Sequence, residues 1–280
     1  MKQINCRVTQ RMMSKKNRPI GVFDSGIGGL TVLKEIVKAM PDEGTIYLGD
    51  TARVPYGIRS PETVIRYSFE NTRFLFSKDI KLLVVACNTA SSIGLDKIKS
   101  AVPIPVIGVI EPGVKAAVKT TRNKKIGIIG TEATIRSNSY SRLIKAAGRN
   151  IEVSGLSCPL FVPLVEEGWV EGDIAIMIAE RYLMDIKNKG IDTLVLGCTH
   201  YPLLKQVISK VMGEGVILID SAVEVAKEVK AILEISGLKR QQKEKPLREF
   251  YVTDSPDRFT KVGERFLGNK IKYIEKITIS

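Results

Sequence analysis

The sequence is poor in the residues from which metal and disulfide sites are built. Its 280 residues include one histidine, His200, and four cysteines, Cys6, Cys87, Cys158 and Cys198. The two closest cysteines are 40 positions apart, so no short-range pair can hold zinc or act as a thioredoxin-like redox couple. We therefore expect no metal site and four free thiols, and a thiol in a polar setting becomes a candidate for reactivity.

Long apolar stretches are also missing. The longest runs, such as 82–87 and 216–219, fall far short of the roughly 20 residues that a membrane-spanning helix needs. The first nineteen residues contain six Lys and Arg but no sustained apolar segment, unlike a secretory signal. These absences predict a cytoplasmic protein without a membrane partner.

Nucleotide-binding signatures are incomplete. The glycine-rich turn at 24–31 leads from a strand to a helix, but Thr31 stands where G-x-G-x-x-G needs its last glycine. A Walker loop would need Gly-Lys-Ser/Thr at its end, which this turn lacks. Asp24 would repel a phosphate, whereas its carboxylate could orient a thiol, accept from an amino group or cap the next helix. We expect no nucleotide or other cofactor.

Acidic residues are outnumbered, which gives a formal net charge of +13. Six of these positive charges lie in residues 1–18, which we interpret as a basic N-terminal extension. The charge allows an alternative of another class, a nonenzymatic regulator that binds nucleic acid or a nucleic-acid enzyme. No stacking-aromatic motif or zinc finger accompanies the charge.

The pattern that is present alternates short Val- and Ile-rich runs with segments of helical period. Expected strands lie at 20–23, 46–48, 82–86, 106–110, 126–129, 194–196 and 216–219, and expected helices at 30–40, 61–77, 93–101, 174–187 and 222–235. A last strand and helix are expected within 251–267. Fully apolar strands indicate a sheet covered on both faces, so the fold class is α/β with mainly parallel strands.

Two parts of the chain resemble each other, which predicts two similar α/β domains. Residues 83–89 and 194–200 are both apolar strands that end in Cys followed by polar residues, and 20–25 has a counterpart in 126–131. Turn chemistry at Pro112-Gly113 suggests a boundary nearby. We expect a discontinuous first domain of 19–115 and 223–280 and a second domain of 116–222.

Cys87 and Cys198 both follow a buried strand, where open α/β sheets gather their ligands. If the two halves face each other, each directs one thiol into a shared cleft. This arrangement suits inversion of a carbon stereocentre, in which one group removes a proton from one face and the other delivers a proton to the opposite face. A free cysteine is more commonly a small buried hydrophobe, but two at matched positions favour a functional pair.

Further candidates surround these cysteines. His200 lies two positions after Cys198 and is a natural proton exchanger. The loop at 50–57 contains Pro55 and Gly57, which can aim backbone amides at a carboxylate, although an ordinary loop is the simpler interpretation. Two adjacent acids, Glu166 and Glu167, end an apolar run, and one of them could turn inward or both could be solvated.

Taken together, four motifs resemble the glutamate racemase family. They are Phe-Asp-Ser-Gly-Ile-Gly-Gly at 23–29, Pro-Tyr-Gly at 55–57, Ala-Cys-Asn-Thr-Ala-Ser at 86–91 and Gly-Cys-Thr-His-Tyr-Pro-Leu-Leu at 197–204. The segments 158–168 and 251–259 are also similar, so the resemblance runs from about residue 19 to the end of the chain. The basic residues at 1–18 and 239–248 depart from most relatives and leave room for a regulatory contact.

The resemblance implies a cofactor-independent isomerase that interconverts L- and D-glutamate, with D-glutamate destined for bacterial peptidoglycan. It implies two Rossmann-like domains with the active site in the cleft between them, assembled as a homodimer. Cys87 would act on the D-glutamate face and Cys198 on the L-glutamate face. Asp24 would assist Cys87, and His200 with one acid of the 166–167 pair, by family pattern Glu167, would assist Cys198.

The substrate contacts implied by the resemblance come from both halves. They are Asp24, Ser25, Pro55, Tyr56, Gly57, Asn88, Thr89, Thr131, Thr134, Thr199 and His200. The nearest rival is a racemase of aspartate or of several acidic amino acids, and the Cys-Thr-His-Tyr-Pro motif argues for glutamate. Because some glutamate racemases are thought to regulate DNA gyrase, the regulatory and enzymatic alternatives could coexist.

Overall fold

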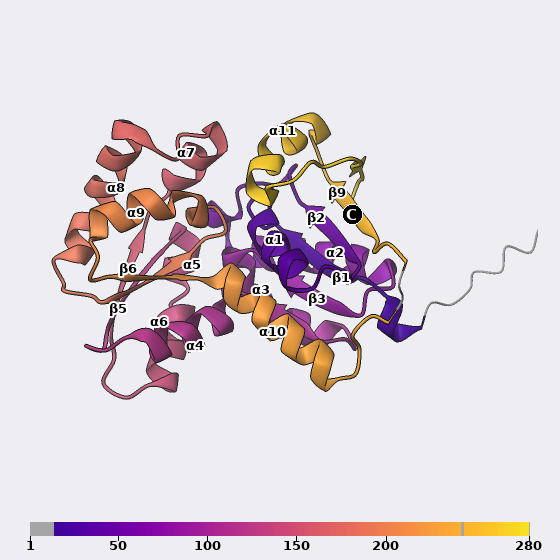
Figure 1. Cartoon of the computed structure of the whole chain (residues 1–280), viewed down its shortest axis with the longest axis horizontal. Coiled ribbons are helices and arrows are strands. Elements are labelled where there is room, and N and C mark those ends of the chain that lie inside the picture. The colour runs from indigo at the N-terminus through magenta and orange to yellow at the C-terminus, as the bar shows by residue number, and fades with distance from the viewer. Residues whose placement is uncertain (1–13, 242–243, 280) are drawn as a thin grey trace, which may run out of the picture.

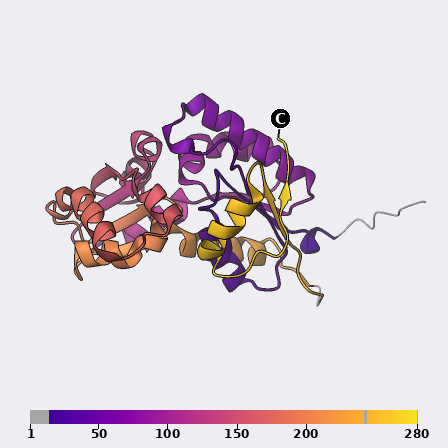
Figure 2. The ribbon, with the colours of Figure 1, turned by 90° about the horizontal axis from the view of Figure 1, so that it is seen from above.

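The computed structural model describes residues 14–241 and 244–279, so Cys6 and residues 1–13 of the basic N-terminal extension lie outside the described residues. The described chain folds into two sheets, each at the centre of one lobe (Figures 1 and 2). Every pairing between the described strands is parallel. The predicted α/β class with two mainly parallel sheets is confirmed.

The first lobe contains a six-stranded sheet of order β10-β9-β2-β1-β3-β4. Its strands are β1 (Ile20–Asp24), β2 (Thr45–Gly49), β3 (Leu82–Val85), β4 (Val106–Gly108), β9 (Arg248–Val252) and β10 (Glu275–Lys276). Its helices are α1 (Leu30–Ala39), α2 (Pro61–Ser77), α3 (Asn88–Ala101) and α11 (Pro256–Leu267), with 3₁₀ turns at Lys15–Asn17 and Tyr56–Ile58. Every residue of β1, β2 and β3 is buried, as expected for strands covered on both faces.

The second lobe contains a four-stranded sheet of order β6-β5-β7-β8. Its strands are β5 (Lys125–Gly130), β6 (Glu152–Ser157), β7 (Thr193–Gly197) and β8 (Ile217–Asp220). Its helices are α5 (Glu132–Arg136), α6 (Ser139–Ala147), α7 (Phe161–Glu167), α8 (Gly172–Lys187) and α9 (Lys205–Met212), with a 3₁₀ turn at Tyr201–Leu204. Strand β6 was not among the predicted strands because this edge strand is mostly polar or partly exposed.

Two helices join the lobes. Helix α10 (Ser221–Ile235) packs against α1 of the first lobe and against α4 (Ile110–Thr120), which in turn packs against α6 of the second lobe (Figure 1). The expected domain boundaries at 115/116 and 222/223 fall within α4 and α10, and they stay a prediction.

The prediction of a chain turn at Pro112-Gly113 is wrong, because both residues are helical and lie near the N-terminus of α4. Proline is tolerated there since backbone N–H groups of the first turn have no intrahelical acceptor. Gly113 allows α4 to approach α10 closely, because a Cβ at this position would lie 2.8 Å from the Ser221 hydroxyl oxygen.

Local sequence explains where the helices begin and which face they bury. In α2, the Ser60 side chain accepts a hydrogen bond from the Thr63 amide, and Pro61 occupies the first helical position. Helix α11 buries Phe259, Val262 and Phe266 against the first lobe and exposes its charged face. No helix within residues 14–241 and 244–279 is long and apolar enough to span a membrane.

Candidate active site

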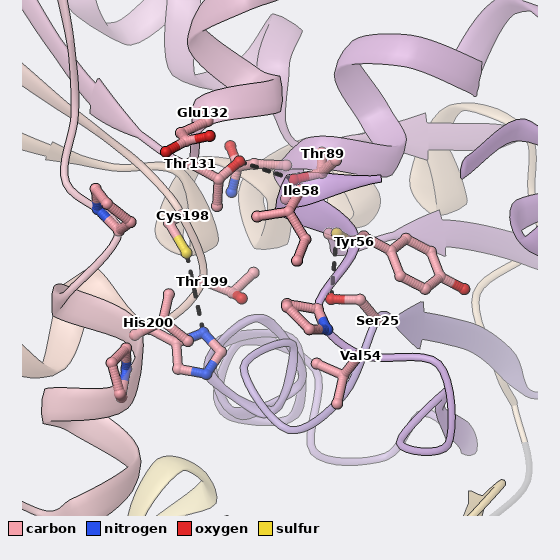
Figure 3. A pocket seen from close by; sticks show the side chains of 17 residues that line it. Ser25, Val54, Tyr56, Ile58, Thr89, Thr131, Glu132, Cys198, Thr199 and His200 are labelled. Atoms are coloured by element: carbon pink, nitrogen blue, oxygen red, sulfur yellow. Dashed lines mark hydrogen bonds between the residues drawn. The ribbon is translucent and has the colours of Figure 1, made fainter. Parts of the chain in front are cut away.

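A cavity of about 240 Å³ lies between the two lobes (Figure 3). It collects residues that directly follow four parallel strands: Ser25 after β1, Cys87 just beyond β3, Thr131 after β5 and Cys198 after β7. The complete lining comprises Ser25, Val54, Pro55, Tyr56, Gly57, Ile58, Cys87, Asn88, Thr89, Thr131, Glu132, Pro159, Val162, Pro163, Cys198, Thr199 and His200. Both sheets therefore present their carboxyl ends to one shared space, which is where open α/β sheets bind ligands.

Cys87 is placed by the junction between β3 and α3. It is the N-cap residue of α3, which begins at Asn88 and not at residue 93 as predicted. Its side chain is nearly buried, and its thiol donates to the Ser25 hydroxyl oxygen over 3.5 Å. Burial and the nearby Asp24 carboxylate raise the pKa of Cys87 to about 12, so the sulfur holds its proton at neutral pH.

Asp24 lies behind this thiol and does not line the cavity. It is 1% exposed, and its Oδ2 accepts a hydrogen bond from the Gly26 amide at 2.9 Å. Its Oδ1 is buried without a hydrogen-bond partner among the described residues. Burial raises the pKa of Asp24. A buried carboxylate with one free oxygen beside a thiol can bind a proton or an amino group.

Cys198 is placed at the opposite side of the cavity by the end of β7, as the positions of Cys198 and Ser25 show (Figure 3). Its sulfur lies 3.9 Å from Nδ1 of His200, and both residues are 6% exposed. The other ring nitrogen of His200, Nε2, lies 3.2 Å from Oε1 of Glu166. Thiol, imidazole and carboxylate are therefore in contact one after the other, with Cys198 and His200 in the cavity lining and Glu166 outside it.

The charges of Cys198, His200 and Glu166 favour a protonated imidazole. Burial lowers the pKa of His200, but hydrogen bonding to Cys198 and Glu166 outweighs burial and raises the pKa to about 10. Hydrogen bonding to His200 lowers the pKa of Glu166. The protonated imidazole therefore places a positive charge beside the Cys198 sulfur.

This arrangement leads to a prediction about His200. Its imidazole should stay protonated to above pH 8, and Glu166→Gln should lower its pKa because one hydrogen bond that stabilises the cation is weakened. Since the sequence contains a single histidine, nuclear magnetic resonance of the ring in untagged protein gives one unambiguous titration curve. A midpoint near the ordinary value of about 6.5 in the unsubstituted protein would contradict the described contacts.

The acid that contacts His200 is Glu166, and the choice of Glu167 from the family pattern is wrong on this point. The two residues end α7, and the helix turns successive side chains about 100° apart, so one faces His200 and the other faces solvent. Glu167 is exposed. Sequence could not decide between them because the choice depends on how α7 packs with its buried apolar side chains, Phe161, Leu164 and Val165.

The loop at 50–57 forms one wall, with a cis peptide between Val54 and Pro55. The hydroxyl of Tyr56 donates to Asp50 and accepts from the Asn71 side chain at 3.0 Å. Arg53 donates to the same Asp50 carboxylate at 2.7 Å. Tyr56 and Asp50 are buried, so these hydrogen bonds fix the loop rigidly against α2.

Hydroxyl groups line the other wall and cross between the lobes. Thr89 of the first lobe lies 2.9 Å from Thr131 of the second, and Thr131 lies 2.9 Å from Thr134, oxygen to oxygen. Thr134 itself is buried behind the lining. Asn88 accepts from the Tyr140 hydroxyl at 2.8 Å, so the start of α3 is held from the second lobe.

The glycine-rich turn brings the lobes into direct contact beside His200. The Thr31 hydroxyl donates to the backbone oxygen of Thr199 at 3.0 Å. A Cβ at Gly28 would lie 2.5 Å from Nδ1 of His200 and closer still to the Thr199 hydroxyl. This close approach requires a glycine at position 28.

None of the described residues that form the lining is lysine or arginine, and the positive side chain that the lining does contain is the protonated His200. An anionic ligand there would be held by hydroxyl groups and backbone N–H groups, with the N-terminus of α3 adding a partial positive charge. Within the described part of the chain, no three His, Cys, Asp or Glu side chains cluster as metal ligands would.

Sequence reasoning missed several lining residues. They are Val54, Ile58, Glu132, Pro159, Val162 and Pro163. Most are apolar residues that resemble core or loop positions, so only the tertiary structure identifies them. Of the predicted site residues, Asp24, Thr134 and Glu167 lie outside the lining and the other predicted residues lie in it.

Comparison with known proteins gives concordant results. The family model described as Asp/Glu/Hydantoin racemase matches residues 20–229. The chain is 53% identical over 262 residues to a glutamate racemase of Geobacter metallireducens, covering 94% of this chain and 97% of that relative. It is 51% identical over 251 residues to a glutamate racemase of Enterococcus faecalis, covering 89% and 92% respectively.

A solved structure is also similar. The crystal structure of glutamate racemase from Francisella tularensis in complex with D-glutamate aligns with a TM-score of 0.89 at 42% identity, covering 94% of this chain and 98% of that one. These similarities extend over both lobes and nearly the whole chain.

Proposed function

The chain belongs to the Asp/Glu/Hydantoin racemase family as one of its glutamate racemases, and we propose that it interconverts L- and D-glutamate with Cys87 and Cys198 as its two proton-transfer groups. The observation that carries the mechanism is that both thiols line one cavity between the lobes, each at the end of a different parallel sheet. Inversion of a carbon by direct transfer of protons between two groups needs one group on each face of that carbon.

The proposed reaction moves one proton in each of two steps. With L-glutamate, the Cys198 thiolate takes the α-proton, and the electron pair of the broken C–H bond stays on the α-carbon as a planar carbanion. The Cys87 thiol then donates its proton to the opposite face and becomes the thiolate. The reverse sequence converts D-glutamate, so no other reactant is consumed. The assignment of faces follows the family resemblance.

The charges around the two sulfurs support opposite starting roles. The pKa of Cys87, raised by burial and Asp24, keeps this thiol protonated and able to donate. His200 lies beside Cys198 and is held in the protonated form by Cys198 and Glu166. We propose that Asp24 serves the Cys87 side and that His200 and Glu166 serve the Cys198 side.

We propose that hydroxyl, amide and backbone N–H groups, together with the protonated His200, hold the two carboxylates of glutamate. The candidate donors are predicted residues that line the cavity, and they lie on loops and helix starts from both lobes: Ser25, Tyr56, Gly57, Asn88, Thr89, Thr131, Thr199 and His200. Pro55 has no N–H to donate and would contact the substrate as part of the cavity wall. Thr134 supports Thr131 from behind. Glutamate is favoured over aspartate because the relatives above are glutamate racemases and one of them was solved with D-glutamate.

Two further proposals rest on the family resemblance. The D-glutamate would serve bacterial peptidoglycan, and the chain would work as a homodimer. Light scattering of the purified protein at micromolar concentration tests the second, and a mass of a single 30.9 kDa chain would reject it.

The function is tested with the purified protein and no added pyridoxal phosphate or metal. Either enantiomer of glutamate should be converted to the racemate, as followed by polarimetry, and in heavy water the product should carry deuterium at its α-carbon. Aspartate at equal concentration should react far more slowly. Absence of glutamate racemisation would reject the function, and inversion with full retention of the original hydrogen would reject the thiol mechanism.

A further inference from the structure

Helix α11 crosses from the first lobe to the acid–base pair of the second. Its apolar face buries Phe259 and Phe266. Figure 1 shows α11 on the first lobe and α7 on the second, and the side chains of two arginines of α11 donate hydrogen bonds to the end of α7. The ring of Phe266 meets the ring of His200 edge to face, with centroids 5.2 Å apart. The helix therefore contacts both members of the His200–Glu166 pair.

Two arginines of α11 hold the end of α7. Arg258 donates from Nη2 to Oε2 of Glu166 at 3.2 Å, while Oε1 of the same carboxylate faces His200 at 3.2 Å. Arg265 donates to the backbone oxygen of Glu166. The next residue but one, Gly168, has a left-handed backbone conformation. Its lack of a side chain leaves room for Arg265, because a Cβ there would overlap the guanidinium.

The two side chains of the Arg258–Glu166 ion pair differ in how far they are exposed to solvent. Its side chain is 18% exposed and uses one oxygen for each partner, whereas the Arg258 side chain is 62% exposed. An ion pair this exposed contributes little to folding stability. It can still fix orientation, because a carboxylate held at one oxygen cannot rotate freely about its last bond. The main effect of Arg258 is therefore on the orientation of the Glu166 carboxylate and not on folding stability.

From this arrangement we propose that Arg258 is a positioning residue for the reaction: it holds Glu166 against His200 and thereby sets the geometry of the Cys198 proton transfer. The proposal rests on the proposed function above. It makes the acid–base group of the second lobe dependent on a helix of the first. Asp24 is the acid on the Cys87 side, and it accepts a hydrogen bond from Gly26 of its own turn. Among its described contacts there is no arginine from the other lobe.

The first test is Arg258→Gln, with Lys261→Gln as the matched control. Lys261 is exposed on the same helix, so its substitution removes one positive charge without touching Glu166. We expect Arg258→Gln to lower kcat/KM about tenfold in both directions, with the melting temperature unchanged. Arg258→Lys should keep more activity than Arg258→Gln, and Lys261→Gln should equal the unsubstituted protein. Full activity in Arg258→Gln would overturn the proposal.

A double-mutant cycle shows whether Arg258 acts through Glu166. In the Glu166→Gln background, Arg258→Gln should cause less than a twofold further loss, because the carboxylate that it orients is gone. A further tenfold loss there would show that Arg258 acts elsewhere and would overturn the proposal.

Isotope effects separate the two sides of the site. Because only the Cys198 step is impaired, Arg258→Gln should increase the effect of α-deuterium in L-glutamate and decrease that in D-glutamate. Equal changes for both enantiomers would indicate general loosening and reject the positioning role. If the unsubstituted protein did not racemise glutamate at all, the proposed function would fail, while the effect of Arg258→Gln on the single histidine resonance would still test its hold on Glu166.

Discussion

Cys87→Ser and Cys198→Ser should each reduce racemisation of glutamate by a factor of about 1,000 or more. A serine hydroxyl has nearly the volume of the thiol but loses a proton far less readily. Each variant therefore lacks one of the two groups that remove the α-proton of glutamate or return a proton to it. Steady-state polarimetry with each enantiomer measures the loss. Racemisation by a single variant at a tenth of the normal rate or better would remove that cysteine from the mechanism.

Cys158→Ser is the matched control. Cys158 is a buried free cysteine outside the cavity lining. Its substitution should lower stability by about 1–3 kcal/mol for burying a hydroxyl but leave kcat within about twofold. Loss of activity in this control at a temperature where the protein is folded would show that the serine changes are not specific.

Exchange of the α-hydrogen in heavy water assigns each sulfur to a face. Cys198→Ser keeps Cys87 and should exchange the hydrogen of D-glutamate without inverting it, while Cys87→Ser should exchange that of L-glutamate. The reverse pattern would leave two thiols in the mechanism but interchange their faces. Nuclear magnetic resonance of the α-proton follows both exchanges.

Gly28→Ala should lower kcat/KM about 100-fold. The added methyl group would lie 2.5 Å from Nδ1 of His200, so the imidazole must move away from Cys198 or the lobes must separate there. Displacements of about 1 Å can cost two orders of magnitude in rate. The free energy of unfolding should fall by about 1–3 kcal/mol, as is usual for overpacking.

Gly26→Ala, in the same turn, is the control for this effect. Its Cβ would meet only the Val54 side chain, at an ordinary 3.5 Å, and the Gly26 amide could still donate to Asp24. Activity should stay within about threefold. If both alanine variants were equally active, the close approach at Gly28 would not matter for catalysis. The His200 resonance should shift in Gly28→Ala and not in Gly26→Ala.

The positions of the two cysteines could be predicted because they follow from local pattern and one general rule. An apolar run of four or five residues predicts a buried strand, and parallel sheets gather functional groups where such strands end. Cys87 and Cys198 each follow a strand of this kind, one in each similar half, so the only further assumption needed to place them in one cavity was that the two halves face each other.

The parts that could not be predicted depend on how separate elements meet. Glu166 and Glu167 are chemically identical neighbours. The packing of the apolar face of α7 decides which of them faces His200, and Arg258 and Arg265, almost 100 residues later, contact Glu166 as well. Pro112-Gly113 has the composition of a turn, but packing of α4 on α10 makes it helical. The apolar lining residues, such as Val162, look like core until the lobes are placed together.

The sheet order of the first lobe has a consequence during biosynthesis. Strand β2 pairs on one side with β1 and on the other with β9, whose residues are made about 200 positions later. Until the ribosome has released β9, one hydrogen-bonding edge of the apolar β2 has no native partner, and such edges promote aggregation. The second lobe, whose strands lie between residues 125 and 220, is translated during this interval. Chaperone demand should therefore concentrate on the lobe that begins first and is completed last.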